Sequence, residues 1–87
     1  MPAREPRRRS YRWHKINPVY GPWYRLTADG KPISGAEVMV MPDMNNERWF
    51  WYVRIGSQKA PRERFDGHEP TLDEARETAR AVFDREY

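Results

Sequence analysis

The side chains best suited to catalysis are few and scattered in this 87-residue chain. No serine lies in a recognisable nucleophile motif, and the two histidines, His14 and His68, are far apart in the sequence. Catalysis needs several titratable groups gathered in one pocket. Asp66, His68 and Glu69 are conceivable metal ligands, but a solvated turn before a helix is the favoured interpretation of that stretch. We therefore expect no enzymatic activity, no cofactor and no metal.

Arginines and aromatic residues carry more information. The run from Arg48 to Arg54 reads R-W-F-W-Y-V-R, with four consecutive aromatic residues. Successive side chains of a strand point to opposite faces, so Phe50, Tyr52 and Arg54 would share one face. The other face would have Trp49, Trp51, Val53 and Ile55. A small domain buries only one such face well, so the exposure of Phe50 and Tyr52 decides what the second face does.

Arginines beside aromatic rings on a sheet face can bind nucleic acid. Arginine neutralises phosphates and releases counterions, and aromatic rings on an open sheet stack on bases. We expect a site formed by a basic N-terminal arm together with the aromatic strand and its neighbours. Its candidate residues are Arg7, Arg8, Arg9, Arg12, Lys15, Arg25, Phe50, Tyr52, Arg54, Arg62 and Arg64.

Two alternatives remain open. Trp13, Tyr20 and Trp23 of the aromatic N-terminal segment can cover Phe50 and Tyr52, which would give a second small core. A second possibility is a protein-interaction or inhibitor module, of the kind found among small phage and mobile-element proteins, or a homodimer. Tyr, Trp, Met and Arg are enriched at protein interfaces, and the two methionines at positions 39 and 41 would supply adaptable contact surface.

Composition bounds the class of protein. The mean hydropathy is −1.09, and the absence of cysteine excludes disulfides and thiolate metal sites. The chain contains neither the roughly 20-residue apolar stretch that spans a bilayer nor the apolar segment of a secretory signal. We expect a soluble, cytoplasmic protein that does not bind membranes.

The charge is divided unevenly along the chain. Residues 1–25 carry seven cations and one carboxylate, a net of +6, whereas residues 26–87 carry nine cations and twelve carboxylates, a net of −3. Basic arms often contact polyanions, although a solvated tail that only confers solubility is the alternative. We expect residues 1–9 to be a disordered basic arm and residues 10–87 to form a single domain.

The pattern of elements predicts an α+β fold, with a small antiparallel sheet of three to four strands packed by one C-terminal helix in two layers. Strands are expected at residues 23–27, 37–41, 48–55 and 62–65, and residues 11–16 are at most a short or irregular strand. Pro42 is expected to end the second of the four strands, and Asp66 and Gly67 to turn the chain after the last.

The C-terminal helix has the clearest pattern. Thr71 and Glu74 form a capping box, in which the threonine hydroxyl accepts a backbone N–H of the first turn. Apolar residues then recur at helical spacing, which predicts one buried stripe. This stripe consists of Leu72, Ala75, Ala79, Val82 and Phe83. We expect it to cover the sheet face that bears Trp49, Trp51 and Val53.

Residues 48–84 contain the motifs W-Y-V-R-I-G, R-x-R-F-x-G and T-x-x-E-A-x-x-x-A in that order. This stretch resembles the AP2-like DNA-binding domains, which include the arm-type domains of phage integrases. The resemblance implies three strands that lie in the DNA major groove and a helix that braces their back. It also implies that Arg25, Arg54, Arg62 and Arg64 face DNA. The segment before residue 42 is longer and more aromatic than that family requires.

Overall fold

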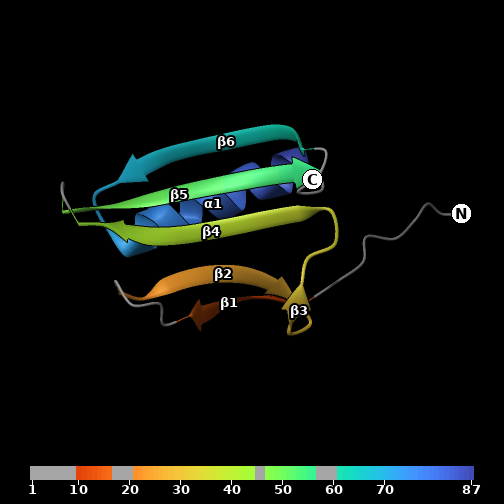
Figure 1. Ribbon diagram of the computed structural model, residues 1–87, viewed down its shortest axis with the longest axis horizontal. Helices are drawn as coiled ribbons and strands as arrows, with labels where there is room; N and C mark the ends of the chain where they lie inside the picture. Colours follow the sequence, from red (N-terminus) through yellow and green to blue (C-terminus); the bar gives the residue numbers. More distant parts are fainter. Residues whose placement is uncertain (1–9, 17–20, 45–46, 57–60) are drawn as a thin grey trace, which may run out of the picture.

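The computed structural model describes residues 10–16, 21–44, 47–56 and 61–87, except for the side chains of residues 61 and 62. The predicted basic arm, residues 1–9, lies outside the described residues. Figure 1 shows a sheet with one helix behind it. The elements are β1 (Tyr11–Ile16), β2 (Trp23–Ala28), β3 (Lys31–Pro32), β4 (Ala36–Asp43), β5 (Arg48–Gly56), β6 (Pro61–Glu69) and α1 (Leu72–Glu86).

All strand pairs are antiparallel. The strands lie in the order β1-β2-β4-β5-β6, and the two-residue β3 pairs with β2 alone. The prediction of an α+β fold with an antiparallel sheet and a C-terminal helix is confirmed, but the sheet has more strands than expected. The main reason is that Tyr11–Ile16 pairs with β2 along its whole length, from Tyr11 opposite Ala28 to Ile16 opposite Trp23.

The pairing between β2 and β4 is short. Only Tyr24 with Val40 and Arg25 with Met39 are paired across it, whereas β4 and β5 pair over the full length of β4. Beyond Arg25 the two strands separate, and β3 lies beside β2 instead. Figure 1 accordingly shows the β1–β2 pair set apart from β4, β5 and β6.

Two expected chain breaks are wrong. Pro42 lies inside β4, opposite Trp49. It is tolerated there because β2 pairs with β4 only at Met39 and Val40, so no strand on that side needs the missing N–H. Gly67 lies inside β6, opposite Trp51, and does not begin a turn. Asp29 and Gly30 form the tight two-residue turn between β2 and β3, and both have the positive φ that such a turn requires, 54° and 80°.

The helix begins as the sequence predicts. The Thr71 hydroxyl accepts the backbone N–H of Glu74 at 3.1 Å, and it donates its own hydrogen to the Glu74 carboxylate at 3.0 Å. Asp73 and Glu74 place negative charge near the positive end of the helix dipole. On the solvent side, Arg80 pairs with Asp84 at 3.0 Å. The two residues are four positions apart, so they are neighbours on the helix surface.

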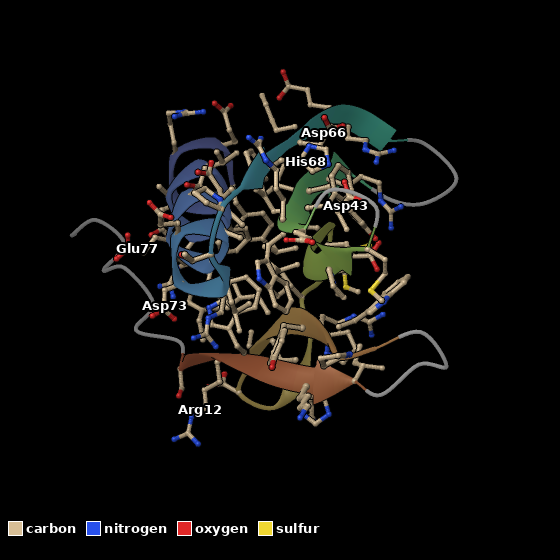
Figure 2. All side chains as sticks on the ribbon, turned by 90° about the vertical axis from the view of Figure 1, so that its left-hand side faces the viewer. Arg12, Asp43, Asp66, His68, Asp73 and Glu77 are labelled. Atoms are coloured by element: carbon tan, nitrogen blue, oxygen red, sulfur yellow. The ribbon has the colours of Figure 1, made fainter. Side chains whose placement is uncertain are left out.

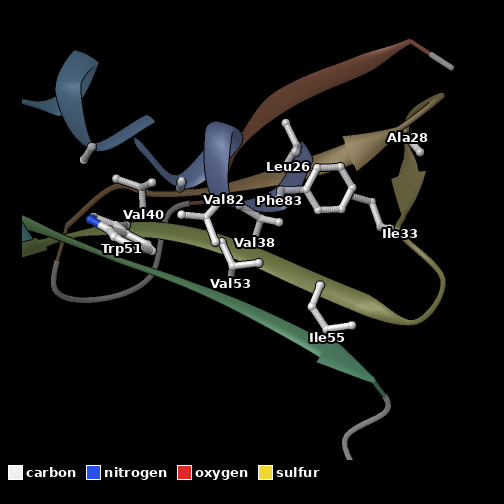
Figure 3. Packing of buried hydrophobic residues seen from close by; sticks show 12 residues of the cluster. Leu26, Ala28, Ile33, Val38, Val40, Trp51, Val53, Ile55, Val82 and Phe83 are labelled. Atoms are coloured by element: carbon white, nitrogen blue, oxygen red, sulfur yellow. The ribbon is translucent and has the colours of Figure 1, made fainter. Parts of the chain in front are cut away.

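The core lies between α1 and one face of the sheet (Figure 3). Its largest fully buried side chain is Phe83 of the helix, against which the Tyr11 ring packs edge-on with centroids 5.3 Å apart. The predicted helix stripe and the predicted core face of β5 are therefore confirmed. The cluster comprises Leu26, Ala28, Ile33, Val38, Val40, Trp51, Val53, Ile55, Ala75, Ala79, Val82 and Phe83.

In the described part of the chain, α1 is too short and too polar to cross a bilayer.

Candidate functional site

The sheet face opposite α1, called here the open face, is formed by the side chains that alternate with the core residues. The register joins one row of these positions across all five long strands. That row consists of His14, Arg25, Met39, Tyr52 and Asp66. Among the described residues no second helix packs on this face, so what it exposes is available to a partner.

An arginine–carboxylate cluster lies on the open face. Glu37 of β4 pairs through one carboxylate oxygen with Arg54 of β5 and through the other with Arg25 of β2, the latter at 3.5 Å. The two guanidinium groups share one carboxylate, so the cluster keeps a net positive charge. The side chains of Arg25, Arg54 and Glu37 are 37%, 23% and 19% exposed. Solvent therefore screens this cluster less than it would a fully exposed pair.

Tyr52 adjoins the cluster. Burial raises its pKa above the ordinary value of 10.0, and the negative charge of Glu37 and a hydrogen bond to that carboxylate act in the same direction. The positive charges of Arg54 and Arg64 oppose these effects. The guanidinium of Arg64 lies over the Tyr52 ring, 5.0 Å from its centroid. It also pairs with Asp66 of the same strand at 3.4 Å. The Tyr52 ring is thus fixed by charged neighbours on two strands.

Phe50 continues the aromatic surface. Its ring centroid lies 6.3 Å from that of Tyr52 and 5.1 Å from that of His68. His68 Nε2 in turn lies 3.0 Å from a carboxylate oxygen of Asp43. Figure 2 shows Asp43, His68 and Asp66 gathered on the same side of the sheet, away from the helix. Phe50 and Tyr52 are half-buried, so their rings are neither core nor freely projecting.

The structure brings together five of the predicted site residues on three strands. These are Arg25 on β2, Phe50, Tyr52 and Arg54 on β5, and Arg64 on β6. The other predicted residues lie elsewhere or outside the described set. Arg12 alternates with Tyr11 and Trp13 and so lies on the open-face side of the edge strand β1, and it points away from the sheet at the bottom of Figure 2. Lys15 pairs with Tyr24, on the helix side of the sheet. Arg62 falls within β6, but its side chain is not described, and Arg7, Arg8 and Arg9 precede the described residues.

The aromatic N-terminal segment does not cover Phe50 through Trp13. Trp13 packs against the core cluster on the helix side, and β1 forms one edge of the sheet. Trp23 alternates with Leu26 and Ala28 of the core and so faces the open side, whereas Tyr20 lies outside the described residues. The suggestion that Met39 supplies contact surface is wrong, because only 2% of it is exposed. Its cross-strand neighbours, Arg25 and Tyr52, are large enough to reach over it.

Glu37 is the site residue that sequence reasoning missed. Its position opposite Arg54 follows from the register of the β4–β5 pair. The connection between these strands, residues 44–47, reads Met-Asn-Asn-Glu and contains no tight-turn dipeptide, so its sequence does not fix that register. A strand pairing shifted by one residue would place Glu37 on the other face.

The three conceivable metal ligands of the sequence do not converge. Asp66 pairs with Arg64 and His68 with Asp43, both on the open face. Glu69 lies opposite Trp49, on the alternate face of β6. Within the described ranges, no group of three or more acidic or histidine side chains is arranged to hold a metal ion.

Comparison with known proteins gives no relative for this chain: no family model, no curated protein and no solved structure matches it. The open face is therefore the basis on which a function is assigned.

Proposed function

We propose that this protein binds nucleic acid through the open face of its sheet, in the cytoplasm and without catalysing a reaction. The observation that carries the proposal is the unequal covering of the sheet. The helix packs on one face only, while the other face presents the rings of Phe50 and Tyr52 among the guanidinium groups of Arg25, Arg54 and Arg64.

The chemistry of these groups suits the ligand. Every base has a π-face that can stack on an aromatic ring, and arginine adds contacts to phosphate and to the ring faces of bases. The half-burial of Phe50 and Tyr52 reduces the side-chain entropy that would be lost on binding. The strand order β4, β5, β6 followed by α1 is the order implied by the resemblance to AP2-like domains, which stays a prediction.

The test is a binding titration of the full chain against fluorescently labelled DNA and RNA, each as single strand and as duplex, at a series of salt concentrations. We expect binding at low salt that weakens steeply as salt rises, because phosphate contacts release counterions. Failure of all four ligands to bind at low salt, or an affinity that does not depend on salt, would contradict the proposal.

A protein partner or a homodimer is the competing function. Met44 is 73% exposed, and within the described part of the sheet the outer edges of β1 and β6 pair with no other strand. Exposed edges can accept a strand from a partner. Sedimentation equilibrium over a range of protein concentrations tests the homodimer directly. A stable dimer that forms without nucleic acid and occludes the open face would favour this second function over the first.

A further inference from the structure

A small hollow adjoins the arginine–carboxylate cluster at the point where β2 and β4 separate. It has a volume of about 240 Å³, and its wall combines Arg25, Glu37 and Arg54 with Pro32, Ile33 and the backbone near Gly56. Pockets that enclose a whole small molecule generally exceed about 300 Å³. The hollow therefore has room for an ion, or for one group of a larger ligand whose remainder lies on the open face.

The donors around the hollow are not all used. The Nε atoms of Arg25 and Arg54 are buried, and neither has a hydrogen-bond partner among the described residues. Each guanidinium uses a terminal nitrogen, Nη2, to reach Glu37. A buried N–H without an acceptor costs free energy that an added acceptor recovers. Both arginines line the hollow, but their Nε atoms are closed to solvent. An acceptor-rich group in the hollow therefore reaches these donors only when a guanidinium group turns away from Glu37.

The net charge of the arginine–carboxylate cluster determines whether the group that fills the hollow is a cation or an anion. Two guanidinium groups and one carboxylate exclude a cation and favour an anion that accepts several hydrogen bonds. Arginine is suited to phosphate because its planar fork donates two parallel N–H bonds. The Glu37 carboxylate already lies between the two guanidinium groups and occupies the place that an oxyanion would take.

We propose that the hollow beside Arg25 and Arg54 binds one backbone phosphate of a nucleic acid, and that Glu37 competes with this phosphate for the two guanidinium groups. The inference rests on the proposed function, since it names the group that the open face would hold. Glu37 thus sets the affinity of the site, and the phosphate must displace its carboxylate from at least one arginine.

The first experiment observes the arginines directly. The Nε–H signals of the full chain are followed by NMR while dithymidine monophosphate, which carries a single phosphodiester, is added. We expect the Arg25 and Arg54 signals to shift together and to saturate. The signal of Arg76, which pairs with Asp73 near the start of the helix, should stay in place. A dinucleotide with an uncharged methylphosphonate link should leave all three unchanged.

Other outcomes of this titration contradict the proposal. If the Arg25 and Arg54 signals do not move although longer oligonucleotides bind, the phosphate site is wrong and the proposed function stands. If no nucleic acid binds at all, both fail. If acetate moves the two signals further than the phosphodiester at equal concentration, the site takes a carboxylate, as a protein partner would supply.

The second experiment tests the role of Glu37. Glu37→Gln keeps the shape and a hydrogen-bond acceptor for Tyr52 but removes the competing charge, so we expect oligonucleotide affinity to rise by about fivefold. Glu77→Gln is the matched control, because it makes the same charge change on the helix, far from the open face (Figure 2). Equal gains from the two variants would show a general charge effect and overturn the competition. Unfolding titrations check that both variants fold.

Discussion

Gly67 of β6 lies directly opposite Trp51 of β5, and the Trp51 indole passes over the glycine so closely that any side chain there would force the ring to shift. A Cβ built at position 67 would meet atoms of this ring at 3.0 to 3.1 Å. Trp51 is itself buried in the core, so the ring cannot swing aside into solvent. The glycine is required by this close approach and not by a turn.

Gly67→Ala is therefore expected to lower the free energy of unfolding by about 1 to 3 kcal/mol, as overpacking does in other cores. Urea denaturation followed by circular dichroism measures the change. The same substitution in a Trp51→Phe background should cost clearly less, because the smaller ring leaves space for the methyl group. An equal cost in both backgrounds would show that the contact with Trp51 is not the cause.

Replacing Phe50 should separate binding from stability. Phe50→Leu keeps an apolar side chain but removes the ring, and base–aromatic stacking contributes about 1 to 3 kcal/mol per base. We expect oligonucleotide affinity to fall by about tenfold or more. Phe65→Leu is the matched control, since Phe65 packs against the core on the opposite face. It should reduce stability and leave affinity nearly unchanged, and the reverse pattern would exclude Phe50 from the binding surface.

The basic arm can be tested without reference to its structure. Replacing Arg7, Arg8 and Arg9 with alanine should flatten the dependence of affinity on salt, by about 0.9 in the logarithmic slope for each duplex phosphate that the arm no longer neutralises. The triple lysine variant keeps the charge and should keep the slope. If the alanine variant shows the same slope as the unmodified chain, the arm does not bind phosphates.

Tyr52 should make the stability depend on pH under alkaline conditions. Its pKa is raised in the folded protein, chiefly by burial and then by Glu37. Above the ordinary value of 10.0, the folded chain therefore keeps a proton that the unfolded chain has released. The folded state binds more protons in that interval, so stability falls as pH rises towards the folded pKa.

Tyr52→Phe removes this contribution together with the hydrogen bond to Glu37. At neutral pH the variant should be less stable than the unmodified chain by about 1 kcal/mol. The difference should shrink as pH rises above 10.0, where the phenol of the unfolded chain ionises. Urea denaturation at a series of pH values measures this trend. A difference that stays constant across the series would show that Tyr52 does not titrate as the structure implies.

The sequence predicts the helix and the core face well because both follow from local periodicity. Thr71 and the apolar stripe through Phe83 specify the helix start and its buried side, and alternation assigns Trp51 and Val53 to the core. Strand ends are less predictable, since Pro42 and Gly67 lie within strands. Whether proline or glycine stops a strand depends on which neighbour pairs there, and that is a property of the assembled sheet.

The candidate site is predictable only in part. Alternation places Phe50, Tyr52 and Arg54 on one face, and the structure agrees. The contact of Glu37 with both Arg25 and Arg54 requires the strand order β2-β4-β5 and one particular register of strand pairing. Neither follows from residue spacing, so the carboxylate between the two arginines is visible only once the strands are paired.

The short pairing between β2 and β4 divides the sheet into two parts, β1–β2 and β4–β5–β6, that should differ in their stability against local unfolding. Two residue pairs join β2 to β4 in the sheet. The other links are the Arg25–Glu37 ion pair and the packing of Tyr11, Leu26 and Ala28 in the core. Because so little backbone pairing crosses this point, we expect β1 and β2 to open more readily than β4, β5 and β6. Amide protons of β1 and β2 should exchange before those of β4 and β5. Arg25 belongs to β2, in the part that should open first, and Arg54 belongs to β5, in the more stable part. A ligand held by both would oppose this opening, and occupancy of the open face would stiffen the whole molecule.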